Sequence, residues 1–334
     1  MIALNRSLKA KVTMKKFIAI VSLGLMFFVS CKSDGQTDEP APVPEEEQLD
    51  GDPDIGDLSA TGIFYDKFEG PIDETKWGKM NRLWGQPTNP LHQHGGVIPE
   101  NVYTKSGYAV MRALGDQYTG TLRGPQGHSK RLGGVLTSKQ RFASGRYEFK
   151  MQVLQAPDVG VLSAAWSFWY KEITKASDPA VWDKAVASGN IPDSNGKMIL
   201  NHEIDIEVKG ANLSNPIYTN WIGEKTGEYD SKNVLYPTGL NDKKFHVYRW
   251  DWHTGGNGQE ARVEYYIDNV LMRTSTTKVP YFASNINVGN WFAWWAGNDS
   301  GTYKAPNFES MEMYVDWVKF TPFNEPNDDF LDNK

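Results

Sequence analysis

The sequence predicts an all-β domain folded as an antiparallel β-sandwich. Short runs of alternating apolar and polar residues recur along the chain, separated by segments rich in Gly, Asn and Asp. This pattern is typical of strands with one buried face joined by tight turns. The runs are not interleaved with regular helical segments, which favours antiparallel pairing over βαβ units. The predicted strands cover 109–112, 134–138, 145–153, 162–170, 204–208, 245–252, 262–268 and 311–320.

Two connections between these strands have signatures of their own. Asp268-Asn269 separates two apolar runs and predicts a hairpin turn. The segment 179–189 begins with Pro179, carries Val and Ala at helical spacing, and ends in Gly189. We expect an inserted loop with a helical turn at that point.

The composition excludes some classes of protein. The 334 residues carry a formal net charge of −6, so the chain lacks the basic surface that a nucleic-acid-binding protein needs. Only one cysteine is present, which excludes an internal disulfide framework. A chain of this length can bury enough apolar surface to fold without one. We expect a monomer.

The N-terminus predicts export and lipidation. Lys15 and Lys16 precede the apolar run 17–29, which is too short for an ordinary membrane span and is followed by Ser30-Cys31. The ending is similar to a bacterial lipobox with Cys31 as the lipidated residue. A plain signal peptide or an uncleaved anchor is the alternative. The first reading predicts a protein anchored by lipid to a bacterial membrane, at the cell surface or in the periplasm.

The rest of the chain divides by composition. Residues 1–31 form the predicted signal peptide, and the acidic, Pro-rich residues 32–60 form a disordered tether. The catalytic domain is expected at 61–323 and a frayed acidic tail at 324–334.

One strand carries the strongest functional signal. In the run 203–208, Glu203, Asp205 and Glu207 alternate with two isoleucines and a valine. Because successive side chains of a strand point to opposite faces, the three carboxylates stand together on one face while the apolar residues enter the core. Like charges placed this closely repel one another, so the row suits acid–base chemistry better than structure. A solvated strand face with ion-pair partners is the alternative. His202 points to the opposite face, where we expect it to be packed.

Aromatic and polar side chains elsewhere in the chain are candidates for the walls of a binding cleft. Trp166 and Trp169 lie an odd number of residues apart, so at most one of them faces the cleft on a regular strand. Some of the candidate tryptophans are expected in the core instead, and Arg82 has an ion-pair role as its alternative. The candidates are Asn81, Arg82, Trp84, Trp166, Trp169, Trp221, Trp291 and Trp295.

Other chemistries have little support. His92 and His94 lie on one strand face, but no third metal ligand follows at a recognisable spacing. No Gly-rich phosphate loop, nucleophile elbow or cysteine nucleophile is evident. We expect that no cofactor is required.

The order of these strands, with Glu203-Ile-Asp-Ile-Glu207 among them, resembles glycoside hydrolase family 16. The resemblance runs from about residue 64 to 320, and its most specific element is the E-x-D-x-E motif. It implies a jelly roll of the concanavalin A-like type, whose concave sheet forms a glycan cleft, and a retaining double displacement. Glu203 then matches the nucleophile, Glu207 the general acid/base and Asp205 the helper carboxylate. The family also implies a structural calcium, for which Glu69 and Asp316 are the candidates.

The motif also bears on the substrate. The family also includes an E-x-D-x-x-E form, which has one more residue before the second glutamate. This sequence lacks that residue, which favours a β-1,3/1,4-glucan as the substrate, cut at internal linkages. The alternative substrate is a β-galactan such as agar, porphyran or carrageenan, or a host glycan, whose sulfates would meet basic side chains. Those side chains are Arg82, Arg123, Lys130 and Arg131. A transglycosylase or a non-catalytic glycan-binding protein on the same fold is the remaining alternative.

Overall fold

A computed structural model of the chain describes residues 62–83, 94–157, 159–299 and 302–331. The predicted signal peptide, Cys31 and the tether at 32–60 therefore lie outside the described residues, as does Trp84. Within the described ranges, no helix has the length and apolar character required to cross a membrane.

The regular secondary structure of the described residues is almost entirely β-strand. All eight predicted strands are present, most of them longer than expected. The strands are β1 (Phe64–Asp66), β2 (Trp77–Lys79), β3 (Gly96–Val97), β4 (Val102–Lys105), β5 (Tyr108–Leu114), β6 (Leu132–Phe142), β7 (Gly145–Gln152), β8 (Leu162–Thr174), β9 (Lys197–Lys209), β10 (Asn212–Trp221), β11 (Tyr229–Asn233), β12 (His246–His253), β13 (Arg262–Ile267), β14 (Val270–Ser275), β15 (Ser284–Trp291), β16 (Asn298–Asp299), β17 (Thr302–Tyr303) and β18 (Ser310–Pro322); the helices are η1 (Pro99–Asn101), α2 (Pro179–Ser188) and η2 (Trp294–Gly297).

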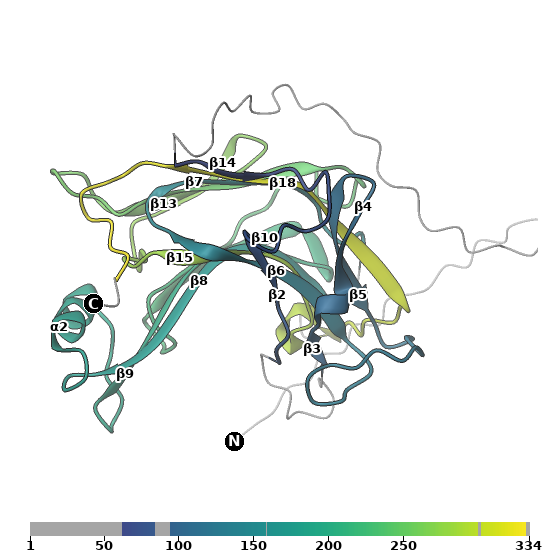
Figure 1. The fold of residues 1–334 in the computed structure, drawn as a ribbon, viewed down its shortest axis with the longest axis horizontal. Helices are drawn as coiled ribbons and strands as arrows, with labels where there is room; N and C mark the ends of the chain where they lie inside the picture. Colours follow the sequence, from purple (N-terminus) through teal and green to yellow (C-terminus); the bar gives the residue numbers. More distant parts are fainter. Residues whose placement is uncertain (1–61, 84–93, 158, 300–301, 332–334) are drawn as a thin grey trace, which may run out of the picture. The chain divides into compact units, whose positions relative to one another are not determined.

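The sheet is one continuous path of strands that folds back on itself. Its order is β11-β10-β9-β8-β15-β6-β5-β18-β7-β12-β13-β14, with four short strands paired at the side. In Figure 1, β7, β13, β14 and β18 form one layer above a second layer that contains β6, β8, β10 and β15. Apart from β3 against β6, the pairings in the described part of the chain are antiparallel. The fold is therefore the expected antiparallel sandwich of the jelly-roll type.

The core lies between the two layers. From the lower layer, Ile204, Ile206 and Val208 of β9 point into it and are buried. From the upper layer, Trp250 on β12 stacks on the Tyr147 ring of β7 at 5.0 Å. Aromatic and branched side chains that interdigitate in this way supply most of the apolar burial that stabilises a sandwich.

The hairpin and the helix appear where the sequence predicts them. Asp268 and Asn269 have φ of +50° and +63°, the left-handed pair that a tight two-residue hairpin requires between β13 and β14. Helix α2 begins at Pro179, and Gly189 caps its C-terminal end with φ of +91°. The helix joins β8 to β9. Its buried residues are Trp182 and Ala185, which lie on its inner face.

The strands β8 and β9 continue together beyond the sandwich. They pair without a break from Leu162↔Lys209 to Thr174↔Lys197. Figure 1 shows this long pair running away from the two layers toward α2. At its outer part, Ile173, Met198 and Leu200 form a small core with α2 and Phe282. The insertion is thus a packed extension of the catalytic strand rather than a loose loop.

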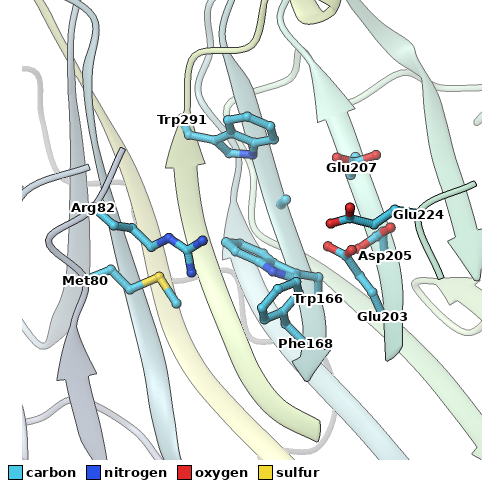
Figure 2. Close-up of a pocket in the computed structure, with 10 residues that line it drawn as sticks. Met80, Arg82, Trp166, Phe168, Glu203, Asp205, Glu207, Glu224 and Trp291 are labelled. Carbon is cyan, nitrogen blue, oxygen red and sulfur yellow. The ribbon is translucent and has the colours of Figure 1, made fainter. Parts of the chain in front are cut away.

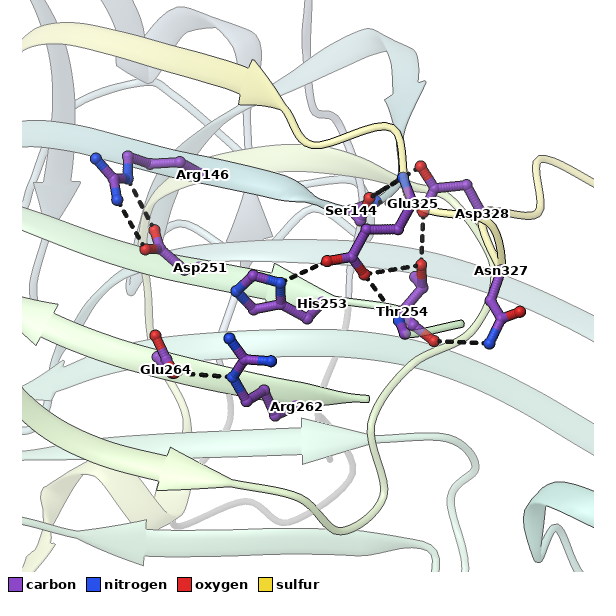
Figure 3. Close-up of polar contacts among 11 residues, drawn as sticks. Ser144, Arg146, Asp251, His253, Thr254, Arg262, Glu264, Glu325, Asn327 and Asp328 are labelled. Carbon is purple, nitrogen blue, oxygen red and sulfur yellow. Dashed lines mark hydrogen bonds and ion pairs between the residues drawn. The ribbon is translucent and has the colours of Figure 1, made fainter. Parts of the chain in front are cut away.

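The tail differs from the frayed segment expected at 324–334, at least as far as the structure describes it. The Glu325 carboxylate lies 2.6 Å from Nδ1 of His253 and accepts the backbone N–H of residue 255 at 2.7 Å. Asp328 accepts a hydrogen bond from the Ser144 hydroxyl at 2.9 Å. Figure 3 shows these contacts fastening the tail to the ends of β7 and β12. The acidic composition thus reflects specific partners, not repulsion into solvent.

Candidate active site

The register of β9 places the three carboxylates on the open face of the lower layer. Ala164, Trp166 and Phe168 of β8 stand opposite Glu207, Asp205 and Glu203, in that order. Residues directly opposite in an antiparallel pair project to the same face. On the other side of β9, Trp221 of β10 stands opposite Glu203. Each acidic side chain is thus flanked by an apolar one, and the smallest of these, Ala164, leaves room beside Glu207.

A cavity of about 220 Å³ opens over this face. Figure 2 shows Arg82 and Met80 at one side, the carboxylates at the other, and Trp166 and Trp291 between them. The ten lining residues are Met80, Arg82, Ala164, Trp166, Phe168, Glu203, Asp205, Glu207, Glu224 and Trp291. An apolar floor with a few convergent polar groups is the usual character of a small-ligand site.

Hydrogen bonds orient two of the carboxylates. Asn201 Nδ2 donates to Glu203 Oε2 at 3.0 Å, and Trp221 Nε1 donates to Asp205 Oδ2 at 2.9 Å. Asp205 and Glu203 also share a hydrogen bond, which lowers the pKa of Glu203 and raises the pKa of Asp205. These hydrogen bonds favour the ionised form of Glu203, the form in which a carboxylate serves as a nucleophile.

Burial and mutual repulsion raise the pKa of all three acids. Burial raises the pKa of Glu203 to about 7, against the opposing effect of its hydrogen bonds from Asn201 and Asp205. Burial, with repulsion from Glu203, raises the pKa of Glu207 to about 8. The pKa of Asp205 is raised well above its usual range by burial and by both neighbours. The trio thus retains protons near neutral pH, which is the condition for one member to act as an acid.

Several other residues predicted for the cleft lie near this site. Arg82, Trp166 and Trp291 line the cavity, and Trp221 contacts Asp205. The ring of Trp295 meets that of Trp291 edge to face at 6.2 Å, so it lies behind a lining residue.

Two predicted cleft residues lie elsewhere. Trp169 projects from the opposite face of β8, where its ring packs on His202 at 5.6 Å and Phe282 at 5.2 Å. The odd spacing from Trp166 explains why only one of the two tryptophans reaches the cavity. Asn81 is exposed and is not among the lining residues.

His202 occupies the interior, as its position on β9 predicts. It is fully buried, and Nδ1 accepts the backbone N–H groups of Tyr281 and Phe282 at 3.2 and 2.9 Å. Burial lowers the pKa of His202 to about 3, so the ring stays neutral and keeps this acceptor. His202 therefore serves the structure behind the site rather than the chemistry in front of it.

Sequence reasoning missed five residues of the site. Ala164, Phe168 and Asn201 are on the cleft face by strand parity, a signal that the pattern already contained. Met80 lies just beyond β2, next to Arg82, which sequence reasoning did identify. Glu224 lies in the connection after β10 and reaches the cavity from a loop, for which no periodic signal exists.

The residues considered for a metal do not form a site. In the described part of the chain, no group of three or more His, Cys, Asp or Glu side chains could hold a metal ion. The Asp316 carboxylate lies 2.8 Å from Nζ of Lys150, a buried ammonium group, and Glu69 is exposed. The Asp316 charge is balanced from within the chain, and these residues do not fit a structural calcium.

Because its pKa is raised, Glu207 should reduce the stability of the folded protein above acidic pH. An unfolded glutamate ionises at about pH 4.3. Between there and about pH 8, the folded chain keeps a proton that the unfolded chain releases, so the free energy of unfolding falls as pH rises.

Glu207→Gln should remove this part of the fall and raise the melting temperature by a few degrees at pH 8, with little difference at pH 4. Thermal unfolding across pH 4–8 measures this, with exposed Glu309→Gln as control. A difference in melting temperature between Glu207→Gln and the unmodified protein that does not grow as pH rises would contradict the raised pKa of Glu207.

Comparison with known proteins gives the same picture. The family model "Glycosyl hydrolases family 16" matches residues 192–319, which include the whole acidic strand. A beta-glucanase of Paenibacillus polymyxa is 26% identical over 191 residues, 56% of this chain and 63% of the relative. A beta-glucanase of Bacillus subtilis (strain 168) is 25% identical over 267 residues, 78% of this chain and 86% of the relative. The chain thus spans just under two thirds of the first of these relatives.

Solved structures share the fold. The Bacillus licheniformis beta-glucanase superposes with a TM-score of 0.53 at 19% identity, over 78% of this chain and 97% of that one. The LamAcat structure from Zobellia galactanivorans gives a TM-score of 0.52 at 19% identity, over 79% of this chain and 99% of that one. With the E-x-D-x-E strand on the open face of a jelly roll, these matches support one assignment for residues 192–319, the part of the chain that the family model covers: glycosyl hydrolases family 16.

Proposed function

We propose that the protein is an endo-acting, retaining glycoside hydrolase that cuts internal linkages of a β-1,3/1,4-glucan. The observation that carries this proposal is the arrangement of Glu203, Asp205 and Glu207 on one face of β9, beneath an open cavity walled by Trp166 and Trp291. Two carboxyl groups beside an aromatic sugar-binding surface are the minimum apparatus for glycoside hydrolysis.

In the proposed mechanism, the Glu203 carboxylate attacks the anomeric carbon of the sugar. Glu207 gives its proton to the departing glycosidic oxygen, and a glycosyl ester on Glu203 forms. A water molecule then enters, loses a proton to Glu207 and displaces Glu203 from the anomeric carbon. Both groups return to their starting protonation states, and the two displacements leave the configuration unchanged. The raised pKa of Glu207, about 8, suits a group that must begin as an acid.

The row of residues across the sheet supports internal cutting. From Phe168 on β8, the row passes Glu203 on β9 and continues to Trp221 on β10 and Tyr229 on β11, whose rings lie 4.5 Å apart. Aromatic surface thus lies on both sides of the carboxylates. A polysaccharide laid across the strands would contact several sugar units on each side of the cut.

Charge in the cleft favours a neutral glucan over a sulfated galactan. The cavity is lined by four carboxyl groups and one guanidinium group, that of Arg82. Arg131 is paired with Asp116 at 2.6 Å, and Arg123 donates to backbone carbonyls of its own loop. The names of the relatives, which are beta-glucanases, support the same choice.

A panel digest tests the proposal. The protein would be incubated with laminarin, barley mixed-linkage glucan, xyloglucan, agarose, porphyran, κ-carrageenan and mucin, and the products separated by chromatography. We expect oligosaccharides from a glucan and none from the Glu203→Gln variant, whose rate should fall by about 10⁴-fold or more because the attacking carboxylate is gone. Products from a galactan alone would overturn the substrate choice. Binding to a glycan without products would indicate a binding protein.

A chemical rescue tests the acid/base role of Glu207. Glu207→Ala should lose hydrolysis of natural glucans, whose leaving group needs the proton. With an aryl β-glycoside of a glucan oligosaccharide, whose leaving group does not, the variant should gain rate with added azide, which replaces the activated water at the glycosyl ester. The product should be a β-glycosyl azide, identified by NMR, because two inversions restore the β configuration. An α-glycosyl azide would contradict retention, and azide should not rescue Glu203→Gln.

We further propose that Cys31 is lipidated and anchors the protein to a bacterial membrane. The observations are the short apolar run at 17–29 and the Ser30-Cys31 ending. Cys31→Ser should move the protein from the membrane fraction to the soluble fraction, as read by immunoblot. Unchanged fractionation would point to a different anchor.

A further inference from the structure

We propose that the cleft contains a lateral subsite that binds a neutral sugar branch carried by the main chain of the substrate. The subsite is formed by Phe168, Tyr170, Asn201 and Glu224. It deepens the function proposed above and rests on it, since it presumes a glucan lying across the strands over Glu203.

The floor of the subsite is a flat pair of aromatic rings. Phe168 and Tyr170 are two residues apart on β8, and their ring planes are inclined by only 16° with centroids 6.4 Å apart. Phe168 lines the cavity, and Tyr170 is 46% exposed, which is unusual for a large aromatic side chain on a paired strand. A flat, solvent-facing pair of rings next to a glycan cleft is the surface on which the apolar face of a pyranose stacks.

The position of Tyr170 separates it from the path of the main chain. Its partner on β9 is Asn201, two residues beyond Glu203, whose row continues to Trp221 and Tyr229. Two residues of strand correspond to roughly 7 Å along β8, whereas the main chain runs across the strands along the row of Glu203. A sugar over Tyr170 therefore lies to the side of the unit at the cut, where a branch would reach and the next main-chain unit would not.

Two acceptor groups border the rings. The Glu224 carboxylate lines the cavity, and its charge adds to burial in raising the pKa of the Tyr170 hydroxyl. Asn201 is 7% exposed, and its Oδ1 has no hydrogen-bond partner in the described part of the chain, while its Nδ2 is used on Glu203. A buried acceptor without a partner is costly, and a sugar hydroxyl would satisfy it. The carboxylates near Asn201 would repel an anionic substituent on the sugar, so we expect the branch to be neutral.

The loop that carries Glu224 is fixed before any ligand arrives. Buried Glu228 accepts the backbone N–H groups of Ile191 at 2.5 Å and Lys225 at 2.7 Å. Asn190 donates to the carbonyl of residue 222 at 2.5 Å, and Tyr281 donates to Asn190 at 2.8 Å. The segment after α2 is thus joined to this loop through buried polar groups. Preorganised walls of this kind reduce the entropy lost when a ligand binds.

Binding to a catalytically silent protein tests the subsite without relying on turnover. The full chain with Glu203→Gln would be titrated by calorimetry with two matched pairs of oligosaccharides. One pair is a linear β-1,3-glucan and the same chain with one β-1,6-glucosyl branch. The other is a linear β-1,4-glucan and the same chain with xylosyl branches. We expect the branched member of at least one pair to bind about tenfold more tightly, the gain that one stacked sugar supplies.

Two further substitutions in this background identify where the gain arises. Tyr170→Ala should remove the preference for the branch and leave the affinity for the linear chain unchanged. The matched control is Tyr229→Ala, a similarly exposed tyrosine (41%) on the row with Glu203, which should weaken both members of a pair alike. Glu224→Gln should weaken the branched member more than the linear one, because Glu224 lines the main cavity and also lies beside the rings of the subsite.

Two results would overturn the subsite. One is equal affinity for linear and branched members in both pairs. The other is an equal loss of affinity for the linear and the branched oligosaccharide after Tyr170→Ala, which would make Tyr170 part of the main-chain path. Either result, with glucan still cut by the unmodified protein, leaves the proposed function standing. Absence of glucan cutting and of glucan binding would remove both.

Discussion

The site depends on two opposing effects on the two faces of β9, electrostatic repulsion on one face and apolar burial on the other. One face carries Glu203, Asp205 and Glu207, whose charges repel, and the other carries Ile204, Ile206 and Val208, which are almost fully buried. Burial of three branched side chains stabilises the strand by several kcal/mol, at about 1.5–3 kcal/mol each. That gain holds the carboxyl groups at a separation that free side chains would avoid. The chemistry of the trio is thus a consequence of apolar packing beneath it.

The surroundings then divide the three carboxyl groups into different roles. Glu203 receives hydrogen bonds from Asn201 and Asp205, which favour its ionised form. The burial of Glu207, together with the negative charge of Glu203, favours its protonated form. The neighbours of two glutamates four positions apart on one strand thus favour different protonation states of their carboxyl groups.

Strand periodicity predicted much of this arrangement and explains where prediction stopped. The common face of the E-x-D-x-E run and the core position of His202 follow from alternation along β9, because a residue's face depends only on its parity. Parity also excludes one of Trp166 and Trp169, but it cannot say which, since that depends on which face of β8 meets the core. Glu224 enters from a loop, whose path is set by the buried Glu228 rather than by any periodic pattern. The fastened tail was missed because acidic residues read as solvated until their partners on β7 and β12 are known.

The same contacts show why the extension of β8 and β9 can form a wall of the cleft. His202, directly behind Glu203, accepts two backbone N–H groups from residues 281 and 282 and stays neutral because it is buried. Lys184 of α2 pairs with Asp329 of the tail at 2.6 Å, and the backbone N–H of residue 283 donates to the Asp329 carbonyl at 2.8 Å. The tail, the helix and the segment before β15 thus brace one another on the side of β9 away from substrate. A strand pair supported in this way can present Phe168 and Tyr170 to the cleft as a rigid surface, which a free hairpin of the same length would not do.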